Sequence, residues 1–163
     1  MTYSTRPGAQ PTWTLAPASY DSDDVRDLLT GLHGEQHLMY GFADHPADTP
    51  AQHFAAPNGQ FLLMRDTGGT AIGCGGWRRM DARTAEIKRM YVHPLHRGQS
   101  LGRQILHHLE EGAKLSGFGF VQLETGVDNT AALALYRSQG YEPITSYRAG
   151  RNPDVNRALR KPL

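Results

Sequence analysis

The sequence predicts a mixed α/β (α+β) fold in which helices flank a central, mostly antiparallel sheet. Three strand-like segments in residues 60–92 follow one another with only short turns between them, which is typical of an antiparallel meander. Two amphipathic helical segments come later, and each is followed by another strand-like segment. This order of elements argues against a doubly wound parallel fold.

Length and composition favour a globular domain. The chain has 163 residues, of which 39% are hydrophobic and 20% charged. We expect residues 1–11 to form a flexible tail and residues 12–163 to form a single domain. The formal net charge of +1 gives no general attraction to nucleic acid or to an anionic membrane, so neither is expected as a partner.

The cellular compartment is also constrained by the sequence. The only cysteine, Cys74, cannot form an intramolecular disulfide, and it fits a reducing compartment. Its apolar strand context favours a buried structural thiol over a nucleophile. No apolar run approaches the roughly 18–20 residues that a membrane span needs, and the polar N-terminus lacks the apolar segment of a signal peptide. A cytoplasmic location is expected.

The first part of the chain is expected to contain a strand and a helix. Residues 12–16 alternate between polar and apolar, as a strand does. Asp21 or Ser22 can cap a helix whose first turn is acidic. The apolar stripe of this helix consists of Val25, Leu28, Leu29 and Leu32.

Two glycines are expected to interrupt that helix. Gly31 and Gly34 each disfavour helix by up to about 1 kcal/mol relative to alanine. We therefore expect a break there, followed by a second short helix over residues 36–40. The proline-containing residues 43–57 are expected to form a loop with one helical turn at residues 51–54.

The remaining elements are predicted from periodicity and turn residues. Strands are expected over residues 60–65, 70–80, 84–92, 118–125, 141–147 and 156–161, and helices over residues 101–114 and 129–138. In the second of these strands, Gly73, Gly75 and Gly76 indicate a bulge or a close backbone approach.

Residues 86–103, EIKRMYVHPLHRGQSLGR, form the segment with the clearest chemical meaning. A strand leads through a proline-marked break into a glycine-containing turn that opens a helix. Unpaired N–H groups and the positive end of the helix dipole make such a helix start suitable for a phosphate. Alone the pattern is also compatible with an ordinary helix start that carries solvated arginines.

A second block gives this segment a family context. Arg97, Ser100 and Gly102 follow the pattern [QR]-x-x-G-x-[GA], with serine where glycine is usual. The later block N-x-x-A-x-x-L-Y-x-x-x-G-[FY] is matched by Asn129, Ala132, Leu135, Tyr136, Gly140 and Tyr141. Together these blocks resemble the GNAT superfamily of acetyl-CoA-dependent N-acetyltransferases. The resemblance covers residues 60–147.

The resemblance implies acetyl-CoA as co-substrate and assigns residues to it. Backbone groups of Met90, Tyr91 and Val92 would pair with the pantetheine arm, and an N–H near Met90 would serve the oxyanion. Asn129 and Tyr136 would contact the pantetheine and the thiol, although Asn129 also suits a helix N-cap. The pyrophosphate would lie on Arg97, Gly98, Gln99, Ser100, Leu101, Gly102 and Arg103.

Direct acetyl transfer to a primary amine needs a base for the ammonium proton and an acid for the leaving thiolate. Tyr136 matches the position of the family's general acid. Glu86 and Glu124 both remain candidates for the base, because family members place it on either strand. A non-catalytic acyl-CoA-binding or sensing module is the alternative function, and a plain interaction domain without a nucleotide site is a second one. A homodimer is common in the family.

The acceptor is the least determined part. Glu35, His37, Tyr40 and Asp44 favour a cationic small molecule, but a solvated surface explains them equally well. A protein N-terminus, a lysine, an amino acid, a polyamine and an aminoglycoside all remain open as acceptors. His33 and His37 are spaced i, i+4, but the order HGEQH is not a zinc motif, so no metal is expected.

Overall fold

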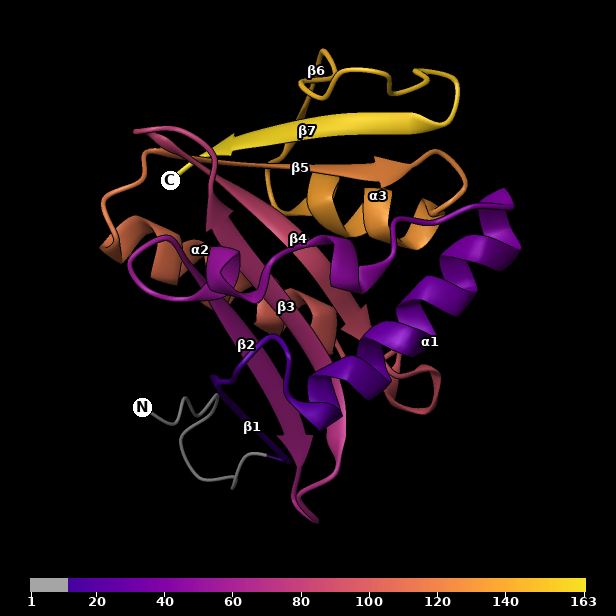
Figure 1. Ribbon diagram of the computed structural model, residues 1–163, viewed down its shortest axis with the longest axis vertical. Helices are drawn as coiled ribbons and strands as arrows, with labels where there is room; N and C mark the ends of the chain where they lie inside the picture. Colours follow the sequence, from indigo (N-terminus) through magenta and orange to yellow (C-terminus); the bar gives the residue numbers. More distant parts are fainter. Residues whose placement is uncertain (1–11) are drawn as a thin grey trace.

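A seven-stranded sheet in the order β1-β2-β3-β4-β5-β7-β6 forms the centre of the structure, a computed structural model that describes residues 12–163 (Figure 1). Neighbouring strands are antiparallel except for the parallel pair β4 and β5. The strands are β1 (Trp13–Pro17), β2 (Gly59–Asp66), β3 (Ala71–Arg79), β4 (Thr84–Val92), β5 (Phe120–Gly126), β6 (Glu142–Ile144) and β7 (Asn156–Pro162). The predicted fold class is confirmed.

Three α-helices flank this sheet, and three short 3-10 turns lie in its connections. The helices are α1 (Asp23–Tyr40), α2 (Leu101–Leu115) and α3 (Thr130–Ser138), and the turns are η1 (Pro46–Asp48), η2 (Ala51–Phe54) and η3 (Pro94–His96). The elements follow the predicted order. The tail predicted for residues 1–11 lies outside the described residues.

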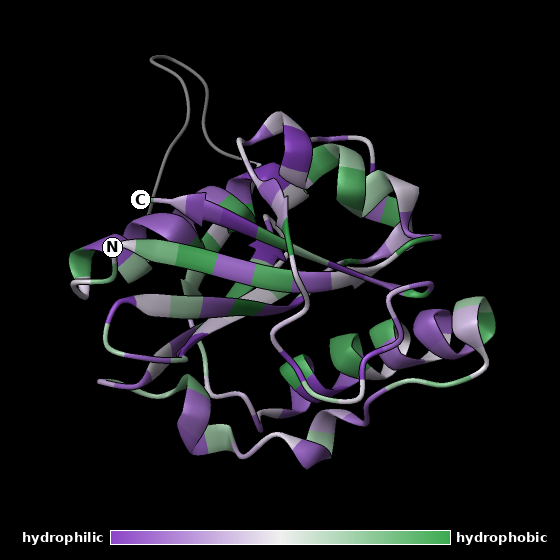
Figure 2. Ribbon diagram, turned by 90° about the horizontal axis from the view of Figure 1, so that it is seen from above, coloured by the Kyte–Doolittle hydropathy of each residue, from purple (hydrophilic) through white to green (hydrophobic). Residues whose placement is uncertain are grey.

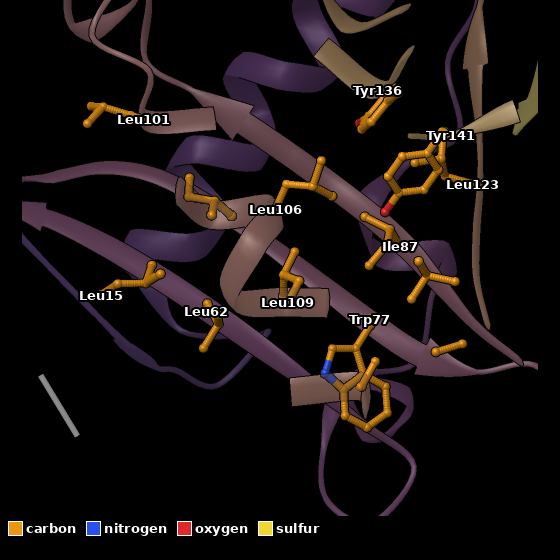
Figure 3. Close-up of a cluster of buried hydrophobic side chains, with 14 of the residues drawn as sticks. Leu15, Leu62, Trp77, Ile87, Leu101, Leu106, Leu109, Leu123, Tyr136 and Tyr141 are labelled. Carbon is orange, nitrogen blue, oxygen red and sulfur yellow. The ribbon is translucent and has the colours of Figure 1, made fainter. Parts of the chain in front are cut away.

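Two hydrophobic clusters hold the helices to opposite faces of the sheet. Helices α2 and α3 pack with Trp77 of β3 and Ile87 of β4, and α1 packs with Phe61 of β2 and Cys74 of β3. Figure 3 shows Leu106 and Leu109 of α2 against the first cluster. Figure 2 shows hydrophobic residues on the strands and on the helices, and in β2 and β3 consecutive residues are buried because helices cover both faces of the sheet. Cys74 is fully buried, as expected for a structural thiol.

The predicted break in α1 is wrong, because the helix continues from Asp23 to Tyr40. Its first half is fixed by buried Val25, Leu28 and Leu29. Gly31 allows the ring of Tyr91 to approach, since a Cβ at residue 31 would lie 2.6 Å from the Tyr91 hydroxyl oxygen. These tertiary contacts outweigh the low helix propensity of glycine.

Alanine substitutions at the two glycines of α1 are expected to have opposite effects. Gly34→Ala should raise the free energy of unfolding by about 0.5–1 kcal/mol, because a Cβ there would meet no atom within 4 Å. Gly31→Ala should show no such gain, because the new methyl group would displace Tyr91. Urea unfolding of both variants measures the difference, and equal stabilisation would contradict this account of Gly31.

The strand predicted over residues 141–147 is shorter than expected. Only Glu142–Ile144 forms β6, which pairs with β7 at the edge of the sheet. Tyr141 precedes it and is buried, and its hydroxyl donates a hydrogen bond to Glu110. After Ile144 the chain leaves the sheet, and Tyr147 donates a hydrogen bond to Glu86 of β4 at 2.8 Å. This departure brings the loop of residues 145–155 over the site described below.

The two middle strands separate soon after they meet. Strands β4 and β5 pair only from Thr84 to Glu86, opposite residues 120–122. Beyond that point β4 bends, since Arg89 and Met90 together face the single residue Gly75 of β3, and Arg89 has a φ of 60°. The predicted irregularity near the β3 glycines is therefore present. One extra residue lies in β4 opposite Gly75, and another, Ile72, lies in β3 itself beside Gly73, where β3 pairs with β2. Figure 1 shows the two strands diverging.

Candidate active site

A pocket of about 180 Å³ lies where β4 and β5 diverge. Met90 of β4 and Glu124 of β5 form its sides, and Tyr136 of α3 closes one end. Tyr40 at the end of α1 and Arg148 and Arg151 of the loop of residues 145–155 also line it. The pocket therefore contains side chains from these five segments of the chain, including all three residues that the sequence nominated for catalysis.

Tyr136 presents a hydroxyl group with little internal bonding. Its side chain is buried, and the hydroxyl lies 3.8 Å from the thioether sulfur of Met90, which is a weak acceptor. Burial raises the pKa of Tyr136 to about 12. The phenol is thus protonated at neutral pH, and its proton can be given to a stronger acceptor than a thioether.

Glu86 is held firmly inside the protein. Its side chain is 2% exposed, and its two oxygen atoms accept hydrogen bonds from Arg78 Nε at 2.9 Å and from Tyr147 at 2.8 Å. Burial, together with the negative charge of Glu86, raises the pKa of Tyr147. The carboxylate of Glu86 therefore anchors β3 and the loop of residues 145–155 to β4.

Glu124 is less completely bonded. One carboxylate oxygen accepts a hydrogen bond from Ser146 at 2.8 Å. The other, Oε2, lies 3.3 Å from Arg151 Nε in an ion pair without hydrogen-bond geometry, and is otherwise unsatisfied among the described residues. Of the two glutamates nominated as base, Glu124 therefore has the freer oxygen atom.

Residues 97–103 form the turn that opens α2. Gly98 has a φ of 80° and Ser100 a φ of 59°, so both are in the left-handed region. The Ser100 hydroxyl makes no capping hydrogen bond, which leaves the first-turn N–H groups of α2 without that partner. A Cβ at Gly102 would meet only ordinary contacts at 3.6 Å or more, so internal packing does not require glycine there. This geometry fits an anion such as a pyrophosphate.

The side chains of this turn differ in what they can offer a ligand. Leu101 is buried in the core, so only its backbone can take part, whereas Gln99 and Arg103 are exposed. Arg97 donates to the carbonyl oxygen of Val92 at 2.9 Å and to both carboxylate oxygens of Glu35 at 2.7 and 2.9 Å. Arg97 therefore joins α1 to the turn in addition to its predicted place beside the pyrophosphate.

Replacing Ser100 with glycine is expected to stabilise the protein. A residue with a side chain loses about 1–2 kcal/mol in the left-handed region, while glycine adds entropy to the unfolded chain. We expect Ser100→Gly to raise the free energy of unfolding by about 0.5–1 kcal/mol. Ser100→Ala keeps the left-handed backbone strain and removes only a hydroxyl that makes no capping hydrogen bond. It should therefore leave the free energy of unfolding nearly unchanged. Chemical denaturation compares them, and a destabilising Ser100→Gly would contradict the strain argument.

The two remaining cofactor predictions fall beside the pocket. Asn129 caps α3, since its side-chain oxygen accepts from the Ala132 N–H at 3.3 Å, and it also lines the pocket. Residues 90–92 of β4 have no backbone pairing with β5. Met90 faces the pocket, whereas the Tyr91 ring packs under α1.

The residues nominated for acceptor binding do not form an acidic surface open to a cationic acceptor, because both of the acidic residues among them are paired with arginines. Glu35 is paired with Arg97, and Asp44 is paired with Arg151 at 2.6 Å. The hydrogen bond from Arg151 lowers the pKa of Asp44. Tyr40 and Asp44 line the pocket, but Glu35 and His37 do not. Within residues 12–163, no group of three potential metal ligands is arranged to hold an ion.

Sequence reasoning missed the cations of the pocket. Lys88, Arg148 and Arg151 all line it, and neither family pattern assigns a role to any of them. Lys88 lies two residues after Glu86, so in a strand the two side chains point to the same face of the sheet. This spacing was the one sequence signal that Lys88 belongs to the site. The arginines are brought in by the loop of residues 145–155, whose course no local pattern predicts.

Comparison with known proteins agrees with this geometry. Residues 23–141 match the acetyltransferase (GNAT) family. A protein of Azospirillum brasilense named IAA acetyltransferase is 40% identical over 133 residues, covering 80% of this chain and 85% of its own. The N-alpha-acetyltransferase RimI of Mycobacterium tuberculosis is 34% identical over 114 residues, covering 68% of this chain and 69% of its own.

Solved structures show the same fold. A candidate acyl-CoA N-acyltransferase from Klebsiella pneumoniae superposes with a TM-score of 0.78 at 30% identity, covering 93% of this chain and 97% of that one. A GNAT acetyltransferase from Elizabethkingia anophelis with acetyl-CoA bound has a TM-score of 0.69 at 22% identity, covering 94% of this chain and 100% of that one.

The chain therefore belongs to the GNAT family of acetyltransferases. It is an acetyl-CoA-dependent N-acetyltransferase, of enzyme class EC 2.3.1.-. Acetyl-CoA is its co-substrate and an amine its acceptor, as the family implies. Within residues 12–163, no helix is both long and apolar enough to cross a membrane.

Proposed function

We propose that the enzyme moves the acetyl group directly to a primary amine, with Glu124 as general base and Tyr136 as general acid. One observation carries this proposal. Both side chains line one pocket, where the Tyr136 hydroxyl meets a thioether and Glu124 Oε2 accepts no hydrogen bond among the described residues. No cysteine is present to form an acyl-enzyme in the pocket, since Cys74 is fully buried outside it.

The protons are accounted for as follows. Glu124 takes one proton from the acceptor ammonium, which has a pKa near 10.4 for an alkyl amine in water. The nitrogen forms a bond to the thioester carbon while the C–S bond breaks, and Tyr136 donates its hydroxyl proton to the sulfur. The second nitrogen proton restores Tyr136 through solvent, and Glu124 releases the first. An N–H near Met90 is offered to the oxyanion.

Glu124 suits the base better than Glu86 does. Both oxygens of Glu86 already accept hydrogen bonds, and its side chain is 2% exposed. Glu124 lines the same pocket with a side chain that is 8% exposed, and its Oε2 atom, although buried, accepts no hydrogen bond among the described residues. We assign Glu86 the task of holding β3, β4 and the loop of residues 145–155 in register.

The turn of residues 97–103 supports pyrophosphate binding in this proposal. Its two left-handed residues and uncapped helix start present backbone N–H groups, and Arg97 and Arg103 add positive charge. Unpaired β4 backbone at residues 90–92 suits the pantetheine arm, which can add to a strand through its amides. Asn129 lies where that arm would end.

The acceptor is a small-molecule or peptide amine. Relatives do not decide between these, because their names differ in acceptor. One is called IAA acetyltransferase, and another is an N-alpha-acetyltransferase. A third, from Salmonella typhimurium and 30% identical over 84 residues, is named for L-methionine sulfoximine and L-methionine sulfone.

An acceptor screen tests the proposed function. Purified protein is mixed with acetyl-CoA and with amino acids, polyamines, aminoglycosides or peptides, and free CoA thiol and acetylated product are measured. We expect CoA release that depends on one class of amine. Tight acetyl-CoA binding by calorimetry without turnover of any amine would favour a non-catalytic acyl-CoA-binding module instead.

A further inference from the structure

The acceptor end of the pocket holds more positive than negative charge. Its carboxylates are each matched by a guanidinium: Glu86 by Arg78 at 2.9 Å, and both Asp44 and Glu124 by Arg151 at 2.6 and 3.3 Å. Two cations are left with only distant partners. Lys88 Nζ lies 3.9 Å from Glu86, and Arg148 Nη1 lies 3.7 Å from Asp44.

Arg89 adds to this imbalance. Its guanidinium donates to the carbonyl oxygens of Asp44 and His45 and to the Thr49 hydroxyl, which are all neutral acceptors. Its charge is therefore not balanced by a carboxylate in those contacts. The pocket wall between β4 and η1 consequently carries positive charge that the fold itself does not neutralise.

Lys88 is placed to meet a ligand. It lies two residues beyond Glu86 on the same face of β4, past the end of the pairing with β5. Its neighbour on β3 is Gly76, where the rings of Phe54 and Phe61 occupy the place of a side chain. The Lys88 side chain is 13% exposed and lines the pocket. A flexible ammonium with no close partner is thus held inside a pocket that an acceptor must enter.

The surroundings of Lys88 favour an incoming anion. Burial lowers its pKa to about 8, the charge of Glu86 opposes that shift, and Arg148, Arg78 and Arg89 lower the pKa further. Burial and the three arginines thus disfavour the charged ammonium at this position, and Glu86 offsets them only in part. A bound anion would reverse them by providing a charge-assisted hydrogen bond.

We propose that the acceptor is a small amine that carries a carboxylate, with the carboxylate bound by Lys88 and Arg148 and the amine directed to Glu124. This inference rests on the proposed function, since it uses the same pocket and the same base. The side chains named above comprise five cations and three carboxylates, so a bound carboxylate meets a surplus of two positive charges. The pocket volume of about 180 Å³ also lies below the roughly 300–1,000 Å³ of drug-sized ligand sites. A free amino acid matches both the charge and the size.

This inference differs from the expectation of a cationic acceptor. That expectation needed Asp44 and Glu35 to be available, and both carboxylates are already paired with arginines. A polyamine would bring further positive charge next to Lys88 and Arg148. It would therefore be repelled where a carboxylate is attracted.

Matched acceptors provide the test. Rates of CoA release are measured for free L-amino acids and for the corresponding amino acid amides, which keep the amine and the side chain but lose the carboxylate charge. We expect kcat/KM to be about 10- to 100-fold higher for the preferred acid than for its amide, the range of one charge-assisted hydrogen bond. Lys88→Met should bring this ratio close to one, and Lys88→Arg should retain most of it.

Lys114→Met is the matched control, because Lys114 is exposed on α2 outside the pocket, and it should leave the ratio unchanged. Acetyl-CoA titration checks that each variant is folded. Equal turnover of acids and amides, preference for polyamines or peptides, or an unchanged ratio in Lys88→Met would overturn the inference while leaving the proposed function intact. Absence of turnover with every amine would overturn both.

Discussion

Replacing Tyr136 with phenylalanine is expected to lower kcat by about 100-fold or more, the usual contribution of a positioned acid or base. The thiolate then leaves without a proton donor beside it. The dissociation constant for acetyl-CoA should change little, because the ring and its packing are kept. Little stability should be lost, since the hydroxyl contacts only the Met90 thioether at 3.8 Å. Steady-state kinetics and calorimetry measure the two quantities.

Tyr141→Phe is a suitable control for this variant. Its ring lies 5.5 Å from that of Tyr136 in the cluster shown in Figure 3, but its hydroxyl donates to Glu110, which does not line the pocket. Tyr141→Phe should therefore lower stability and leave kcat largely unchanged. An unchanged kcat in Tyr136→Phe would remove that tyrosine from the mechanism.

The pH dependence of the wild-type enzyme follows from the same residue. Because burial raises the pKa of Tyr136 to about 12, its acid form persists up to about pH 11 and is lost only above that. Any alkaline loss of activity below pH 11 must then arise from another group. The Tyr136→Phe variant should therefore show the same alkaline loss of activity in its pH–rate profile, with a lower rate at every pH.

Replacing Glu124 with glutamine should remove the acidic limb of the pH–rate profile and lower kcat/KM by about 100-fold or more, as loss of a general base does. Glutamine keeps the size of the side chain and can still meet Ser146. The falling rate at low pH arises when the base becomes protonated, so a variant without the base has no such limb. Profiles of kcat/KM against pH provide the measurement.

Glu86→Gln is the matched comparison. This variant should keep the acidic limb of the pH–rate profile if Glu124 is the base. It should also lower the free energy of unfolding by about 1–3 kcal/mol, because Arg78 loses its charged partner in a nearly buried position. Should Glu86→Gln abolish the acidic limb and Glu124→Gln retain it, the two assignments would be exchanged.

Much of the fold was predictable because its signals are local. Strands β2, β3 and β4 are short apolar segments separated by turn residues, and the apolar stripe of α2 has a helical period. Where prediction failed, distant contacts decided the outcome. Helix α1 passes through Gly31 because Tyr91, sixty residues later, packs against it.

The site was predictable only where it coincides with sequence blocks. Tyr136 and Glu124 line the pocket as their positions in the chain suggested. The choice between Glu86 and Glu124 was not accessible from sequence, because it depends on which carboxylate Arg78 and Tyr147 occupy. Lys88 and Arg148 were missed for a related reason. Their significance comes from the balance of charges across three segments, and no short pattern contains that balance.

Because β4 and β5 pair over a short stretch, the candidate active site lies between two parts of the fold, one that contains β4 and one that contains β5 and α3. These parts are called the two bodies below. One body brings Lys88 and Met90, the other brings Glu124 and Tyr136, and backbone pairing joins them over only three residues of each strand. Ala85 and Val121, both fully buried, sit in this seam. Neither residue lines the pocket, yet both lie in the segment where backbone pairing holds β4 against β5. The shape of the candidate site thus depends partly on small apolar residues outside it.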